Sequence, residues 1–459
     1  MESMRKTALL SVFLFLAATV VSAAAATPAK AVEQNDNKPE SVEAFMDMGF
    51  GMFIHWSMDS QLGVVISHSM AGASEDYLNR FVNELPKTFN PYKFNPDDIA
   101  VLAKLAGMKY VVFTTKHHSG FSMFKTRETD FNIMNTPYGK DITKELVQAL
   151  RKQGIAVGFY YSPEDFRVLY KQNYPIGRTQ RERHFPANNP ELMEHDKRQI
   201  KELLTNYGKI DILFFDGPAD GLKQYAWSLQ PDIMVTRGHI STPEQKTPDS
   251  PVPGPWESCY TMGTDWNYKP TNDPHKSGTD VIKMLIEIRA KGGNFLLNIG
   301  PKPDGEVQIE QEARLREVAL WNFVNGESIH NVRPWKVIRE GSTWFTASKD
   351  GKTVYAFVTD PWKYRERRNF LFCSVKGTSE TKVSVLGYGG EIMEYVNTDP
   401  RIRWEATSLG LAVSAVNGQR YYTNNQWPNP VVLKLENVEY NEPVPYEVKE
   451  PVLKMDGTI

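Results

Sequence analysis

Several features that mark other classes of protein are rare in this sequence. It has two cysteines among 459 residues, Cys259 and Cys373, so it is not a disulfide scaffold and its hydrophobic core must hold it together. We expect both to be free, buried thiols, although the sequence leaves open whether they pair. Lys plus Arg (53) and Asp plus Glu (55) almost cancel, leaving a net charge of -2. This balance argues against nucleic acid as a partner, because a duplex-binding protein normally carries a basic face.

Long apolar runs are missing after the N-terminus. Arg5 and Lys6 precede an apolar run over residues 8–21, and the small residues of 22–26 offer cleavage sites. This pattern is typical of a secretory signal peptide at 1–26. The run is shorter than the ~20 apolar residues of a spanning helix, so a membrane anchor is the weaker alternative. We expect an exported protein, periplasmic or secreted, with no membrane insertion once the signal is removed.

Strand and helix patterns alternate along the first three quarters of the chain. Strands are expected at 52–55, 110–114, 155–161, 210–215, 233–236, 257–260 and 295–298, and helices at 97–106, 141–153, 189–207, 219–229, 279–291 and 308–325. Roughly eight strand signals of this kind favour an α/β fold with a (β/α)8 TIM-like barrel. A doubly wound open sheet is the alternative. No G-x-G-x-x-G turn follows the first strand, which weakens a dinucleotide-binding version of that sheet.

After Arg333-Pro334-Trp335 helical patterns stop and short strands separated by turn residues take over. These strands are expected at 343–347, 353–359, 370–372, 382–385, 391–395, 410–416 and 431–434. They favour a C-terminal antiparallel β-sandwich. The predicted organisation is a signal peptide (1–26), a linker (27–40), a catalytic barrel (41–338) and a β-sandwich (339–459).

Polar residues at the predicted strand exits indicate where chemistry takes place, because a barrel of this kind carries its active site at the carboxyl ends of its strands. Two acids stand out. Asp216 follows the apolar run 212–215, and Glu257 follows Trp256, whose ring would raise the pKa of the carboxyl group beside it. Two carboxyl groups flanking one bond are the arrangement of glycoside hydrolysis. Glu164 and Asp165 are rival acids on a neighbouring loop.

Histidines at the strand exits also raise the possibility of a metal. Adjacent His117 and His118 would point in opposite directions on a regular strand, so they can share a site with His55 only from a loop. We therefore predict no metal and keep a metal-dependent barrel hydrolase as an alternative. Four other histidines have polar sequence neighbours and are expected at the surface: His184, His195, His275 and His330.

Several segments, taken in order, resemble one known family. They are 50–56, 109–121, 158–162, 211–217, 256–257, 293–301 with Asp304-Gly305, 325–327 and 333–335. The combination resembles glycoside hydrolase family 29, the α-L-fucosidases. The resemblance implies a barrel followed by a β-sandwich and no cofactor. It also implies exo-acting, retaining hydrolysis of terminal α-L-fucose from a fucosylated oligosaccharide or glycoconjugate through a covalent intermediate.

The resemblance also implies roles for individual residues. Asp216 takes the position of the nucleophile and Glu257 that of the general acid/base, with carboxyl groups ~5–5.5 Å apart in a retaining enzyme. The residues expected to bind the sugar are His55, His117, His118, Tyr161, Arg237, Trp266 and Glu75.

Two departures from the family leave the substrate open. The Glu-Trp-Tyr segment of the family becomes Glu75-Asp76-Tyr77, and Ser119 replaces the aspartate of Lys-His-His-Asp-Gly. A glycosidase acting on a related L-sugar, such as an α-L-galactoside, and a catalytically silent glycan-binding homologue are therefore the alternatives.

Overall fold

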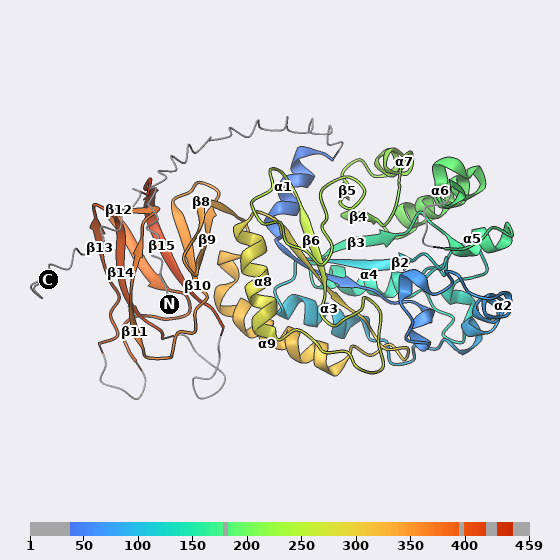
Figure 1. Ribbon diagram of the computed structural model, residues 1–459, viewed down its shortest axis with the longest axis horizontal. Coiled ribbons are helices and arrows are strands. Elements are labelled where there is room, and N and C mark those ends of the chain that lie inside the picture. The colour runs from blue at the N-terminus through green and yellow to red at the C-terminus, as the bar shows by residue number, and fades with distance from the viewer. Residues whose placement is uncertain (1–36, 178–181, 394–398, 419–428, 444–459) are drawn as a thin grey trace, which may run out of the picture. The chain divides into compact units, whose positions relative to one another are not determined.

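The computed structural model describes residues 37–177, 182–393, 399–418 and 429–443 (Figure 1). The predicted signal peptide lies outside the described residues, and so does the predicted linker up to residue 36. Helix α1 (Pro39–Met48) begins within the last residues of that linker. No helix in the described part of the chain is long and apolar enough to cross a membrane.

A curled parallel sheet forms the larger part of the molecule. Its strands are β1 (Phe50–Ile54), β2 (Tyr110–Lys116), β3 (Ala156–Tyr161), β4 (Ile212–Phe215), β5 (Met234–Val235), β6 (Glu257–Thr261) and β7 (Asn294–Ile299). They lie in the order β5-β4-β3-β2-β1-β7-β6, and each neighbouring pair is parallel. The seven strands that the sequence located by residue range are all confirmed. The carboxyl ends therefore share one edge of the sheet.

The predicted eighth strand is not confirmed. The sheet of the described residues has seven strands, and its two edge strands are β5 and β6. Two isolated parallel bridges lie between these edge strands. One joins Ser241 to Trp256, the residue before β6, and the other joins Glu244 to Cys259 within β6. Prolines stand at positions 243, 248, 251, 253 and 255. Each proline lacks the backbone N–H that a ladder of hydrogen bonds needs, so this segment runs beside β6 without forming a strand.

Helices alternate with these strands along the chain. They are α2 (Glu75–Asn83), α3 (Pro96–Leu105), α4 (Ile142–Lys152), α5 (Phe166–Lys171), α6 (Pro190–Asn206), α7 (Leu222–Leu229), α8 (Gly278–Ala290) and α9 (Ile309–Asn325). The six predicted helices are all present, while α1, α2 and α5 were not predicted. Sequence signals set several starts. The side chains of Asn95 and Asn189 accept hydrogen bonds from the backbone three residues on, and a proline follows each.

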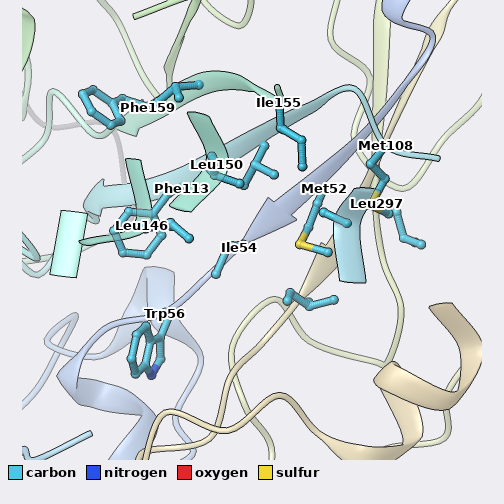
Figure 2. Close-up of a cluster of buried hydrophobic side chains, with 14 of the residues drawn as sticks. Met52, Ile54, Trp56, Met108, Phe113, Leu146, Leu150, Ile155, Phe159 and Leu297 are labelled. Carbon is cyan, nitrogen blue, oxygen red and sulfur yellow. The ribbon is translucent and has the colours of Figure 1, made fainter. Parts of the chain in front are cut away.

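The two faces of the sheet are buried in separate hydrophobic clusters, because successive strand residues point to opposite faces. On the outer face, Ile54 belongs to a large cluster that includes Leu146 and Leu150 of α4 (Figure 2). On the inner face, Phe53 and Tyr160 pack in a second cluster together with Phe214 and Cys259. A side chain at the end of a strand therefore reaches the interior of the curl only if it has the parity of the inner face.

The C-terminal part consists of antiparallel sheets, as predicted. One has β12 (Val375–Val385), β15 (Val431–Tyr440), β10 (Thr353–Val358), β9 (Thr343–Ser348) and β8 (Val332–Glu340), and the other has β11 (Arg367–Phe372), β14 (Gly410–Val416) and β13 (Arg403–Thr407). Both contribute to one core that includes Phe345 and Phe372. Strand β13 was not predicted, and the strand expected at 391–395 is absent from its described residues, 391–393.

Strand β8 crosses the predicted boundary between residues 338 and 339. The module is also tied to the helical layer, since Trp321 of α9 donates a hydrogen bond from Nε1 to the carbonyl oxygen of Pro430 (2.8 Å). The cysteines are both free, as expected, but only Cys259 is buried, and Cys373 is partly exposed.

Candidate active site

Asp216 lies directly after β4 at the carboxyl edge of the sheet, with a quarter of its side chain exposed. Tyr160 donates a hydrogen bond to Oδ2 (2.6 Å), and Nε2 of His118 lies 3.3 Å from the same oxygen. Nε of Arg237 lies 3.6 Å from Oδ1. Burial alone would raise the pKa of Asp216, but His118 and the charge of Arg237 outweigh it and hold that pKa well below its usual value. The carboxylate is therefore ionised at neutral pH, as a nucleophile requires.

His117 and His118 lie on the loop that follows β2, which is how adjacent histidines can reach one site. The backbone N–H of His118 donates to Nδ1 of His117 (2.9 Å), so a neutral His117 carries its proton on Nε2. The His117 ring lies parallel to that of Tyr160, with 4.9 Å between the ring centroids and 11° between the planes. His117 thus stacks on the tyrosine that donates to Asp216, and His118 contacts Asp216 itself.

His55 lies beside Trp266, with 4.8 Å between their ring centroids. Nδ1 of His55 is 2.7 Å from Oδ1 of Asn298, while Nδ2 of Asn298 donates to the carbonyl oxygen of Trp266 (2.7 Å). The amide oxygen accepts, so the His55 proton is on Nδ1 and Nε2 is left as an acceptor. Burial lowers the pKa of His55 to about 4, which keeps the ring neutral.

Glu244 is a carboxylate of this site that no sequence pattern indicated. Its Oε2 accepts a hydrogen bond from Nη2 of Arg237 (2.9 Å), and its Oε1 accepts one from Nε1 of Trp266 (3.1 Å). Its side chain is 39% exposed. Because Nε of the same guanidinium faces Asp216, Arg237 connects two carboxylates of different exposure. Arg237 thus contacts Asp216 directly, and Trp266 is joined to Arg237 through Glu244. Their binding of the sugar remains a prediction.

Glu257 lies at the amino ends of the strands, whereas Asp216 lies at their carboxyl ends. It is the first residue of β6, pairs in register with Asn294 at the start of β7, and is fully buried. Tyr110, the first residue of β2, donates a hydrogen bond to its Oε2 (2.5 Å). Burial raises the pKa of Glu257 to about 8. The structure therefore does not bring Glu257 to Asp216, because Glu257 begins a parallel strand and Asp216 follows one.

Tyr161 also differs from its expected place. Its hydroxyl donates to Oδ1 of Asp196 (2.7 Å) and lies 2.9 Å from Oε1 of Gln199, both on α6. It has the parity of the outer face, and Tyr160 takes the position next to Asp216. Glu75, the first residue of α2, is exposed, and no contact among the described residues joins it to Asp216.

The rival acids and two of the presumed surface histidines lie behind the site. Lys116 is held between Asp165 (3.1 Å) and Asp196 (3.0 Å), and all three are buried. Glu164 contacts His118 and His184. The expectation of surface positions was wrong for His184 and His195, which are buried. His275 and His330 are partly buried.

Of the described residues, His117, His118 and Asp216 form one group with metal-compatible spacing, with ligand atoms within 4.8 Å of one another. One nitrogen of His117 and one oxygen of Asp216 are already engaged by protein hydrogen bonds. Nδ1 of His117 accepts from a backbone N–H, and Oδ2 of Asp216 accepts from Tyr160. The absence of a metal therefore remains our prediction for this site.

The site defines a class of enzyme by three features. It has an ionised aspartate at the carboxyl ends of a curled parallel sheet, a second carboxylate joined to it through an arginine, and histidines beside aromatic rings. These are the parts of a glycoside hydrolase that works with two carboxyl groups.

Comparisons with known proteins identify the family within that class. The family profile described as alpha-L-fucosidase matches residues 16–327. Plasma alpha-L-fucosidase of Rattus norvegicus is 28% identical over 412 residues, covering 78% of this chain and 85% of its own. Tissue alpha-L-fucosidase of Homo sapiens is 29% identical over 404 residues, covering 78% and 82%.

Solved structures agree. Alpha-L-fucosidase isoenzyme 1 from Paenibacillus thiaminolyticus has a TM-score of 0.69 at 27% identity, covering 87% of this chain and 99% of its own. A trapped covalent intermediate of a fucosidase from Bacteroides thetaiotaomicron has the same fold, with a TM-score of 0.69 at 23% identity, covering 89% and 98%. The chain belongs to the α-L-fucosidase family, glycoside hydrolase family 29.

Proposed function

We propose that this chain is an exported, exo-acting α-L-fucosidase that releases terminal α-L-fucose from fucosylated oligosaccharides or glycoconjugates with retention of configuration. The ionised Asp216 carries this proposal, because it is held at the carboxyl edge of the sheet by Tyr160, His118 and Arg237. Export rests on the basic and apolar pattern of residues 1–26.

In the first step, Asp216 attacks the anomeric carbon and forms a glycosyl ester as the leaving oxygen departs. Oδ2 of Asp216 is held by Tyr160 and His118, whereas the contact of Oδ1 with Arg237 is longer. Oδ1 is therefore the oxygen more able to form the new bond. In the second step, water attacks the same carbon and the Asp216 carboxylate leaves, so two inversions give net retention.

We assign the general acid/base to Glu244 in place of Glu257. Glu244 is joined to Asp216 through Arg237 and is exposed enough to exchange protons with water. It protonates the leaving oxygen in the first step and takes a proton from the attacking water in the second. Glu257 is fully buried at the amino ends of the strands, so it reaches neither the leaving oxygen nor the attacking water.

The sugar itself is bound by the residues around these carboxylates. His55 offers an acceptor at Nε2, while a neutral His117 carries a donor hydrogen, so the two rings bind sugar hydroxyls of complementary role. Trp266 supplies an apolar ring beside His55, which suits the methyl group of fucose. Glu75 remains a proposed sugar ligand on the resemblance alone.

Three variants assayed on an aryl α-L-fucoside test these roles. Asp216→Asn is expected to lower kcat by about 10⁴-fold or more. Glu244→Ala is expected to accumulate the glycosyl enzyme. Added azide then restores turnover and yields α-L-fucosyl azide, because azide enters on the face that water uses. Glu257→Gln is the matched control and is expected to keep most of its activity.

The outcomes separate the assignments. Azide rescue of Glu257→Ala, with no effect in Glu244→Ala, would return the acid/base role to Glu257. Full activity of Asp216→Asn would remove the proposed mechanism. A parallel assay on an aryl α-L-galactoside tests the alternative L-sugar, which differs from fucose by a hydroxyl on C6. Binding without turnover of either substrate would support the silent glycan-binding homologue.

A further inference from the structure

His118 lies between two carboxylates that belong to different loops. Nε2 lies 3.3 Å from Oδ2 of Asp216, after β4, and Nδ1 lies 3.1 Å from Oε2 of Glu164, after β3. Nδ1 is also 2.5 Å from Oγ of Ser162, whose hydroxyl donates to the carbonyl oxygen of Glu164 (2.9 Å). The hydroxyl hydrogen is thus committed to that carbonyl, so Nδ1 must be the donor toward Ser162 and Glu164. Both ring nitrogens of His118 face oxygens that accept.

Glu164 is itself held by a buried histidine. Nδ1 of His184 is 2.6 Å from Oε1 of Glu164, and Nε2 of His184 is 3.1 Å from the carbonyl oxygen of Pro175. A carbonyl only accepts, so Nε2 donates. The His184 side chain is 1% exposed and that of Glu164 13%, so this pair is shielded from water.

The local structure around Glu164 explains its direction. The neighbouring Asp165 caps α5 by accepting a hydrogen bond from the backbone N–H of Val168 (2.9 Å), and it pairs with Lys116 on the outer side of the sheet. The cap fixes the backbone at this turn. The two acids at the end of β3 thus serve different layers, one supporting Lys116 and the other supporting His118.

We infer that Glu164 and His184 are positioning residues for the fucosidase reaction, acting on Asp216 through the ring of His118. This inference rests on the proposed function. When Asp216 becomes an ester, its negative charge disappears and His118 loses one of its two anionic partners. Glu164 keeps its charge and holds the ring in place. Nε2–H then faces the ester oxygen that is not bonded to the sugar, and that oxygen regains its charge as the ester is hydrolysed.

Other charged and titratable groups around His118 do not replace Glu164. His55 and His117 lie nearby from β1 and the β2 loop, and Arg237 lies across Asp216 from the β5 side. None of these adds a negative charge. Burial alone would lower the pKa of His118, but hydrogen bonds and charge from Asp216 and Glu164 outweigh it and raise that pKa. Glu164 is the anion that remains once Asp216 has reacted.

The test removes the negative charge of Glu164 and keeps the shape of its side chain. Glu164→Gln is expected to lower kcat by about 10- to 100-fold, the loss of one charge-assisted hydrogen bond, with little change in KM. Glu164→Asp keeps the charge and is expected to recover part of the loss. His184→Gln removes the support of Glu164 and is expected to give a smaller fall in kcat. Glu182→Gln is the matched control, since Glu182 is an exposed acid two residues before His184.

A second readout does not depend on turnover. In ¹⁵N-histidine spectra of the full chain, the ring of His118 is expected to lose its second proton at a lower pH in Glu164→Gln than in wild type. Unchanged kcat and an unchanged His118 titration in Glu164→Gln would overturn the inference. Equal losses of kcat in Glu164→Gln and Glu164→Asp with an unmoved titration would show a structural role only and would also overturn it. Failure of wild type on every fucoside would instead overturn the proposed function, while the His118 titration would still test the contact.

Discussion

Replacing Glu257 by Gln tests the placement of this residue at the amino edge of the sheet. Glu257 is fully buried, accepts a hydrogen bond from Tyr110, and has no hydrogen-bond partner for Oε1 among the described residues. These surroundings favour the protonated carboxyl group, and burial raises its pKa to about 8. A glutamine has the same shape and no proton to lose, so Glu257→Gln is expected to fold and to keep most of its activity.

The effect on stability follows from proton linkage. The pKa of Glu257 is raised in the folded state from an ordinary value of 4.5 to about 8, so the folded state binds the proton more tightly than the unfolded state. The stabilisation is complete below the unfolded pKa and is lost as the pH rises toward 8. Between pH 5 and pH 8 the wild type is expected to lose about 3 to 4 kcal/mol from this one group.

Urea unfolding of both proteins between pH 5 and pH 8 measures this difference. The free energy of unfolding of Glu257→Gln is expected to fall by about 3 to 4 kcal/mol less than that of wild type over this range. Glu310→Gln at the exposed start of α9 is the control, and its pH dependence is expected to follow wild type. Parallel pH profiles for wild type and Glu257→Gln would refute the buried, protonated carboxyl group. Loss of turnover in Glu257→Gln that azide restores in Glu257→Ala would refute the placement itself.

Four further predictions follow from the contacts of the site. Tyr160→Phe is expected to lower kcat about 10-fold or more, because it removes the hydroxyl that donates to Asp216. Tyr161→Phe is expected to lower the free energy of unfolding by about 1 to 3 kcal/mol with nearly unchanged kcat. A loss of kcat in Tyr161→Phe and none in Tyr160→Phe would mean that Tyr161, and not Tyr160, faces Asp216. Dialysis against a chelator is expected to leave kcat/KM unchanged, and recovery of lost activity by added Zn²⁺ or Mn²⁺ would contradict the metal-free site. Trp266→Ala is expected to raise KM for the aryl fucoside more than it lowers kcat, because the ring beside His55 is lost, and an unchanged KM would remove Trp266 from the sugar site.

The arginine that joins the two carboxylates explains why the site tolerates them near each other. The Arg237 guanidinium contacts Asp216 through Nε and Glu244 through Nη2, and it lies over the Phe214 ring, 5.5 Å from the centroid. Asp216 and Glu244 raise the pKa of Arg237 against the effect of burial, so its charge is permanent. Under the proposed mechanism, this charge lets Asp216 stay ionised beside a second acid.

Much of the fold was predictable because its signals are local. Caps such as Asn95 and Asn189 mark helix starts, and apolar runs such as 212–215 mark buried strands. Asp216 was predictable for the same reason, since a carboxylate directly after a buried parallel strand must lie at the carboxyl edge. The family resemblance added the order of the motifs, and the family comparison confirms it.

The choice between neighbouring residues depended on the tertiary structure. Tyr160 and Tyr161 are adjacent and chemically identical, and only the pairing of β3 in the sheet decides which of them faces Asp216. Glu257 was assigned to the site as if it followed a strand, but register with β7 shows that it begins one. His184 has polar sequence neighbours yet lies buried against Glu164.

The position of Glu244 could not be predicted from the sequence. It lies in a proline-rich segment with no strand periodicity, and its position comes from isolated bridges to β6 and from its contacts with Arg237 and Trp266. The sequence by itself determined the alternation of strands and helices, the antiparallel module and the aspartate after β4, because local patterning and strand polarity are written in adjacent residues. Only the tertiary structure decided which acid is joined to Asp216 through Arg237 and which tyrosine donates to it, because those choices depend on sheet register and on contacts between residues far apart in the chain.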